Sequence, residues 1–174
     1  MEIYMKRLTA KTPKHTLLIL LVLACMAPGA ATAATSTALL AVSATVLSVC
    51  GIAATPMVFG NYSSTSGTPT DATSTITATC TSGVPYTIAM DAGAGTGGTV
   101  ATRVLASGGN TLNYTVYSNT GRTTIWGDGT NSTSTVGGTG GLVPQIYTAY
   151  GRIPTGQLSP AGVYLDTVTV TLTY

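Results

Sequence analysis

The sequence closes with twelve residues, 163–174 (VYLDTVTVTLTY), in which apolar side chains and threonine alternate. Successive side chains of a β-strand point to opposite faces, so a period of two is typical of a strand. Four apolar residues fall on one face of this run: Val168, Val170, Leu172 and Tyr174. Threonines fill the opposite face, and we therefore predict a strand with one buried face and one face in water.

A second alternating run, residues 38–46, lies near the other end of the sequence. One face of this run carries Leu40, Val42, Ala44 and Val46. The opposite face is apolar too, as expected of a strand that is enclosed on both sides. A free tail of this composition would be prone to aggregate, so the pattern predicts that these residues have a dedicated partner.

Residues 1–33 have the organisation of a signal peptide. Basic residues between Lys6 and His15 precede an apolar stretch at 17–27, and small residues at 31 and 33 fit a cleavage site. We predict a mature chain that begins near Ala34, with no remaining membrane span, because the apolar stretch is too short for an anchor. A lipoprotein is the alternative, since Cys25 follows residues that loosely resemble a lipobox.

Short strand patterns separated by turn signals fill the rest of the mature chain, and no helix-period segment of useful length occurs in it. The expected strands, both terminal runs included, cover residues 38–49, 57–59, 74–80, 86–90, 111–117, 123–126, 143–153 and 163–174. The linking segments are rich in the Gly, Ser, Thr, Asn and Asp that tight turns require. About 141 residues remain after the leader (174 − 33), which suits one domain, and the pattern predicts an all-β sandwich.

Removal of the leader changes the charge of the protein. The mature chain retains three arginines, at 103, 122 and 152, against four aspartates, at 71, 91, 128 and 166, which gives a net charge of −1 (3 − 4). No basic patch remains to bind nucleic acid or an anionic membrane. The three arginines are scattered along the sequence and predict no carboxylate or phosphate clamp.

Two cysteines, Cys50 and Cys80, remain in the mature chain if Cys25 is removed or lipidated. Export to an oxidising compartment makes a disulfide between them the expected state. A metal site would need more ligands than two thiolates, and the mature chain has no histidine to supply them.

The mature chain has no His, Glu or Lys, which removes the usual general bases and imidazole ligands. We expect Asp128, between two glycines, to be a turn residue. Asp91 and Asp166 are the candidates for a glycosidase-like carboxylate pair, but nothing in the sequence brings them together. The glycine-rich residues 93–98 have dinucleotide-binding spacing without a following helix, so we expect a loop. We predict no enzyme, with no catalytic, cofactor-binding or metal-binding residues.

Aromatic side chains offer two interpretations. Trp126, Phe59, Tyr114 and Tyr150 would pack in the core or along strands, or else form an exposed platform that binds sugars. We favour the packing interpretation.

Six segments together resemble one known family. They are residues 42–46 (VSATV) before Cys50, 57–62 (MVFGNY), 76–91 (ITATCTSGVPYTIAMD), 110–130 (NTLNYTVYSNTGRTTIWGDGT), 150–157 (YGRIPTGQ) and 160–174 (PAGVYLDTVTVTLTY). In this order they cover nearly the whole mature chain and resemble the spore coat protein U domain family. That family includes the subunits of archaic chaperone-usher pili of Gram-negative bacteria.

The resemblance implies an incomplete immunoglobulin-like β-sandwich that lacks its last strand and is completed by donor-strand complementation. By this analogy residues 34–49 are a donor extension and residues 50–174 the pilin domain. The donor side chains are those at 40, 42, 44 and 46, and the last strand with its acceptor groove carries those at 168, 170, 172 and 174. The contact is heterologous and does not close, so it generates a homopolymeric fibre.

The resemblance also implies a route and partners. Such subunits pass through the periplasm with a chaperone, are assembled by an outer-membrane usher and end in a cell-surface fimbria that serves adhesion and biofilm formation. Residues 47–49 are more apolar than a hinge between strands would be, which leaves the border of the donor strand open by a few residues. Shaft and tip-adaptor positions remain open, as do the adhesion target and the stability of a subunit without a donor.

Two other functions remain open at this point. One is a monomeric secreted carbohydrate-binding or adhesin module, although a two-domain tip adhesin would need a binding domain ahead of the pilin domain. The other is a spore-coat protein, which the family also includes.

Overall fold

A computed structural model describes residues 32–174. The predicted signal peptide and Cys25 lie outside the described residues, except for Thr32 and Ala33. The described chain divides into residues 32–43 and a compact unit, residues 44–174. Residues 32–49 form no regular secondary structure. The described residues include no helix long and apolar enough to cross a membrane.

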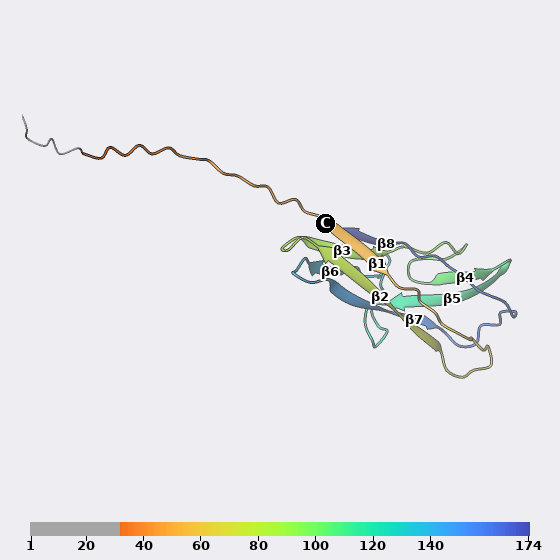
Figure 1. Cartoon of the computed structure of the whole chain (residues 1–174). Coiled ribbons are helices and arrows are strands. Elements are labelled where there is room, and N and C mark those ends of the chain that lie inside the picture. Colours follow the sequence, from red (N-terminus) through yellow and green to blue (C-terminus); the bar gives the residue numbers. More distant parts are fainter. Residues whose placement is uncertain (1–31) are drawn as a thin grey trace, which may run out of the picture. The chain divides into compact units, whose positions relative to one another are not determined.

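The compact unit consists of two antiparallel sheets (Figure 1). Its strands are β1 (Cys50–Ala54), β2 (Thr70–Cys80), β3 (Pro85–Met90), β4 (Arg103–Ser107), β5 (Asn110–Tyr117), β6 (Val136–Thr139), β7 (Gln145–Ile153) and β8 (Val170–Thr173). One sheet has the order β1-β2-β7-β5-β4 and the other the order β6-β3-β8. The all-β sandwich predicted from the sequence is therefore confirmed.

Side chains from both sheets meet in one hydrophobic core. Alternate residues of β2 point inward, and Ile76 and Ala78 are completely buried between the sheets. Trp126 is also fully buried, and its indole N–H donates to the carbonyl of Ile88 at 3.1 Å. The other buried apolar residues are Cys80, Tyr86, Ile88, Met90, Val104, Leu112, Tyr114, Val116, Ala149 and Ile153. Trp126 and Tyr114 are thus core residues, which confirms the packing interpretation for these two aromatics.

A disulfide joins Cys50 to Cys80, as the sequence predicts. The two residues are also direct partners in the β1–β2 ladder. The bond therefore ties the first residue of an edge strand to its neighbour β2, which is paired on both sides.

Several strand predictions differ from the structure. Residues 38–49 and 57–59 are not strands, and residues 123–126 form only isolated bridges. Of the predicted run 163–174, only Val170–Thr173 pairs as a strand. Its partner β3 ends at Met90, and the preceding Thr169 N–H donates to the Asp91 carboxylate at 2.9 Å. The sequence did not predict β1, β4 or β6; β4 forms a hairpin with β5, whereas β1 and β6 pair with strands farther away in the sequence.

Arg103 begins β4 and is fully buried. Its Nε donates to the carbonyl of Asp91 at 2.8 Å, and its Nη2 donates to the carbonyl of Trp126 at 3.0 Å. Burial lowers the pKa of this guanidinium from its usual value. Arg103 thus connects β4 to the end of β3 and to the segment that carries Trp126.

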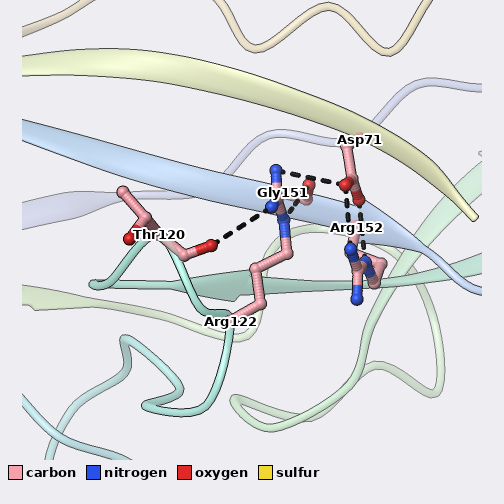
Figure 2. Close-up of polar contacts among 5 residues, drawn as sticks. All are labelled: Asp71, Thr120, Arg122, Gly151 and Arg152. Carbon is pink, nitrogen blue, oxygen red and sulfur yellow. Dashed lines mark hydrogen bonds and ion pairs between the residues drawn. The ribbon is translucent and has the colours of Figure 1, made fainter.

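The other two arginines meet at one carboxylate, which corrects the expectation of scattered cations (Figure 2). Arg152 on β7 makes two hydrogen bonds to Asp71 on β2, at 2.8 and 2.9 Å. Arg122 Nη2 lies 3.3 Å from the same carboxylate, and its Nε donates to the carbonyl of Gly151 at 3.4 Å. Arg122 adopts a φ of 53°, a left-handed conformation that is uncommon for this residue type. The cluster holds the turn after β5 against β2 and β7.

Replacing both bridged cysteines, Cys50→Ser with Cys80→Ser, should lower the free energy of unfolding by about 3–4 kcal/mol, because the crosslink restricts the unfolded chain. Urea unfolding of the exported protein measures this change. Reduction of the wild type should reproduce it and leave the double variant unchanged. Equal unfolding midpoints for oxidised and reduced wild type would contradict the prediction.

Asp71→Asn should lower the melting temperature at pH 7 by about 1–4 °C, the range expected for a partly exposed ion pair. The hydrogen bonds from Arg152, together with the charge of Arg122, hold the pKa of Asp71 below its usual value. The stabilisation is therefore complete above the unfolded-state pKa and is lost as the pH falls through the folded-state pKa.

Thermal unfolding from pH 7 down to pH 2 checks the sign of this effect. The difference between wild type and Asp71→Asn should shrink in acid, because both side chains are then neutral. Arg152→Lys keeps the charge but not the paired hydrogen bonds, and it should be intermediate. A difference that grows in acid would refute this account of Asp71.

Candidate functional site

Strands β1 and β8 form facing edges of the two sheets. Within the described residues β1 pairs only with β2, and β8 pairs only with β3. The two edge strands lie next to each other, but no ladder joins them. Their free sides therefore present main-chain N–H and C=O groups that a further strand would be able to use.

The two edges diverge beyond β1 because of the local sequence. The Thr55 N–H still donates to the carbonyl of Thr75 at 2.9 Å, but Pro56 has no N–H and ends the pairing. The following residues, 57–62, leave β2 and form one wall of a groove. The residues before β8 form the opposite wall.

The deeper part of this groove is an apolar cavity of about 270 Å³. Met57 and Phe59 line one wall and Val168 and Val170 the other. The core residues Ile76, Tyr114, Val116 and Ala149 also line it, so its floor is the core itself. The side chains of Met57 and Phe59 crowd Gly151 of β7 so closely that a Cβ there would clash with both.

A second cavity, of about 650 Å³, continues the groove. The two cavities share Met57, Phe59, Leu105 and Asp166. Residues 57–62 and 159–166 form the two sides of the second cavity. Together the two cavities make a groove that runs from the apolar core to the segment where Leu165 pairs with Ala106 in an isolated bridge.

One carboxylate fixes the wall of the groove. Asp166 accepts the N–H groups of Ala94 and Gly95, at 2.7 and 3.0 Å, and the hydroxyl of Tyr114 at 2.7 Å. Burial, followed by the hydrogen bond to Asp166, raises the pKa of Tyr114 well above its usual value. A Cβ on Gly93, whose φ is 81°, would clash with the Asp166 carboxylate, so this close approach requires glycine.

Asp91 holds the other side of the same loop. Its carboxylate accepts the N–H groups of Gly93 and Thr169, each at 2.9 Å. Burial alone would raise the pKa of Asp91, but the hydrogen bonds from Thr169 and Gly93 hold it below its usual value. The structure therefore brings Asp91 and Asp166 to one loop, a proximity that the sequence did not indicate. Both carboxylates accept main-chain hydrogen bonds from this loop, which occupy their oxygens.

Three further points from the sequence concern the turn at Asp128, the glycine-rich loop and metal ligands. Asp128 accepts the N–H and hydroxyl of Thr130, at 2.9 and 2.7 Å, and is a turn residue as predicted. Residues 93–98 form a loop, also as predicted. Residues 32–174 contain no group of three or more His, Cys, Asp or Glu side chains that would hold a metal ion.

The residues predicted for the last strand occupy different environments. Val168 and Val170 line the groove, and Leu172 is half-buried against the core. Tyr174 follows the strand and is 59% exposed. Sequence reasoning missed Leu105 and Asp166 as groove residues, because β4 was not predicted and an aspartate within an alternating run was not expected to bind a loop.

The predicted donor residues are exposed. The exposed fractions of Leu40, Val42 and Val46 are 87%, 84% and 82%, and Ala44 is exposed as well. Residues 47–49 are held in place, since the Thr81 N–H donates to the carbonyl of Val49 at 2.9 Å and the Val49 N–H donates to Thr81 Oγ1 at 3.1 Å. Residues 47–49 thus run beside the end of β2 before β1 begins.

A protein of known structure has a similar fold. A chain in the crystal structure of the CsuC–CsuE chaperone–tip adhesion subunit pre-assembly complex, from archaic chaperone-usher Csu pili of Acinetobacter baumannii, is similar to this protein. The identity is 26% and the TM-score 0.53, over 75% of this chain and 40% of that chain. This chain therefore spans less than half the length of the chain that it matches. No curated protein matches its sequence.

A model of one protein family also matches. The Spore Coat Protein U domain covers residues 36–171, which is most of the chain and nearly all of the part that the structure describes. The family resemblance of the six sequence segments is thereby confirmed. This protein belongs to the Spore Coat Protein U domain family.

Proposed function

We propose that this protein is a structural subunit of a secreted adhesive pilus, which polymerises head to tail by inserting its N-terminal strand into the groove of the next subunit. The observation that carries the proposal is the pairing of an open apolar groove with an exposed apolar extension in one chain. Strand addition gains affinity from main-chain hydrogen bonds and register from alternate side chains. The alternation of residues 38–46 suits both requirements.

Insertion into a neighbour is favoured over insertion into the same domain. Residues 47–49 are bonded to Thr81 and run beside the end of β2. A return into the chain's own groove would need a reversal within residues 40–46, the same residues that must lie extended in the groove. A groove on a second copy places no such demand on the chain.

The edge strands must separate during insertion. Neighbouring strands lie about 4.8 Å apart, so two strands that flank a third are about 9.6 Å apart. β1 and β8 include Cα pairs within 8 Å of each other. The groove is therefore contracted beside β1 and open farther along, and we infer that the donor enters at the open part and separates β1 from β8 as it pairs.

The partners and location follow from the family and from the similar structure. We propose that a periplasmic chaperone holds the unpolymerised subunit, as the pre-assembly complex of the similar protein suggests. An outer-membrane usher then assembles the fibre on the cell surface, where it serves adhesion and biofilm formation. The buried positions of Trp126 and Tyr114 speak against a sugar-binding platform built on these two residues.

Fibres sheared from cells should give a ladder of multiples of the subunit on denaturing gels without boiling, and a single band after boiling. Strand-complemented contacts dissociate slowly, because many main-chain bonds must break together. A single monomer band in the unboiled lane would contradict polymerisation and favour a monomeric binding module.

Val42→Asp should abolish the ladder, because insertion would bury an unpaired carboxylate at a cost of several kcal/mol, enough for more than about a 100-fold loss of polymer. Val42 is exposed in the subunit, so the change leaves its folding unaffected. Ser36→Asp, in the same exposed extension but ahead of the alternating run 38–46, is the matched control and should retain polymers. Gel ladders, with subunit amounts from whole-cell blots, measure both.

Deletion of residues 34–46 tests the same role without introducing a charge. The truncated subunit should be recovered with a chaperone and accept a donor from the wild type, yet donate nothing itself. Ladders of the truncated subunit alone, or equal loss of polymer in Val42→Asp and Ser36→Asp, would refute the donor assignment.

A further inference from the structure

Exposed apolar side chains gather at two opposite ends of the folded domain. The β2–β7 register pairs Ala78 with Gln145 at one end and Thr70 with Ile153 at the other. Cys50 pairs with Cys80 at the first end, which therefore also carries the start of β1. The β4–β5 turn lies at the second end, far from the C-terminus in Figure 1. We call these the extension end and the far end.

A loop at residues 140–144 forms the apolar surface of the extension end. Leu142 is 97% exposed and Val143 is 67% exposed. The Gly83 N–H donates to the carbonyl of Gly140 at 2.9 Å, and the Gly140 N–H donates to the carbonyl of Val84 at 2.8 Å. These bonds fix the loop beside the β2–β3 turn, close to Thr81, which in turn binds residues 47–49.

The far end has an apolar surface of its own, at the mouth of the groove. Val163 and Leu165 are 75% and 69% exposed, and Leu158 is 91% exposed. Two hydrogen bonds of 2.9 Å between Leu165 and Ala106 attach this segment to β4. The Ser159 hydroxyl donates to the carbonyl of Thr111 at 2.7 Å. We call residues 158–165 the rim.

The directions of the strands determine which ends face each other in a polymer. β1 runs from the extension end toward the far end, and β8 runs the opposite way, since Val170 pairs with Met90 and Thr173 with Thr87. A donor antiparallel to β8 would lie parallel to β1 and leave the groove at the far end. A parallel donor would leave at the extension end, where the acceptor's own extension already emerges. The antiparallel donor therefore brings the extension end of one subunit to the far end of the next.

The connection between donor and domain is short. Three residues separate Val46 from Cys50, and an extended chain spans at most about 3.5 Å per residue, or about 14 Å in total. The bonds to Thr81 restrict these three residues further. The domain that supplies the donor must therefore lie against the mouth of the groove that receives it.

We propose that Leu142 and Val143 of one subunit dock on the rim of the next subunit, where they cover Val163 and Leu165. This contact rests on the proposed function and adds to it a second interface between neighbouring subunits, outside the donor strand. It buries apolar surface that is exposed at both ends of the isolated domain. It holds successive domains at one angle and so stiffens the fibre. Leu47 and Val49 are exposed in the same connection between donor and domain.

Disulfide trapping tests the contact in assembled fibres. The double variant Leu142→Cys with Val163→Cys should give ladders that survive boiling without reductant and collapse with it, because each fibre becomes linked at every junction. The native cysteines are already joined to each other and do not compete. Thr120→Cys with Val163→Cys is the matched control, since Thr120 is an exposed side chain in the turn after β5. The control should not crosslink.

The outcomes separate the contact from the proposed function. Unboiled ladders in both double variants, with no reductant-sensitive link in either or equal links in both, would overturn the contact and leave strand donation intact. Absence of ladders from the wild type itself would instead refute the proposed function.

A second variant keeps the test decisive if the cysteines impair export. Leu142→Ser with Val143→Ser should leave the ladder intact and lower the persistence length of fibres in electron micrographs at least twofold. An unchanged persistence length would overturn the stiffening contact.

Discussion

The groove and its proposed role depend on two sheet edges that face each other without a strand between them. Main-chain polar groups and apolar side chains both need partners, and along the free sides of β1 and β8 the described residues supply neither. The floor of the resulting groove is the hydrophobic core itself, with Ile76 and Val116 at its base. An extended apolar segment would satisfy both needs together, and the chain carries one in its own exposed extension.

Two local features keep the groove and the extension in position. Asp166 binds the loop at residues 94–95 and the hydroxyl of Tyr114, which fixes the wall that carries Val168 and Val170. The Cys50–Cys80 disulfide ties β1 to β2 at the point where the extension leaves. A pull on the extension would otherwise load an edge strand of five residues that is paired on one side. The disulfide passes that load to the longest strand of the domain.

Strands with clear alternation were predictable from the sequence, and those without it were not. Residues 74–80, 86–90 and 111–117 were expected to be strands and lie within β2, β3 and β5. β6 contains Gly137 and Gly138, which favour a loop interpretation, yet a Cβ at position 138 would clash with the hydroxyls of Tyr86 and Tyr147. β4 begins with Arg103, whose burial depends on the carbonyls of Asp91 and Trp126. Residues 57–59 have a strand-like pattern but form a wall of the groove without pairing as a strand. The pattern therefore identified their apolar face and not their secondary structure.

The sequence by itself determined an all-β sandwich, its disulfide, its family and an alternating apolar run at each end. These properties depend on short stretches, because side-chain alternation and turn residues act locally. Only the tertiary structure decided that β1 and β8 keep free edges, that residues 57–62 and 159–170 become the two walls of one groove, and that Asp71 binds both Arg122 and Arg152. The physical reason is that each of these features joins segments far apart in the chain, and local periodicity carries no information about which distant segment a strand meets.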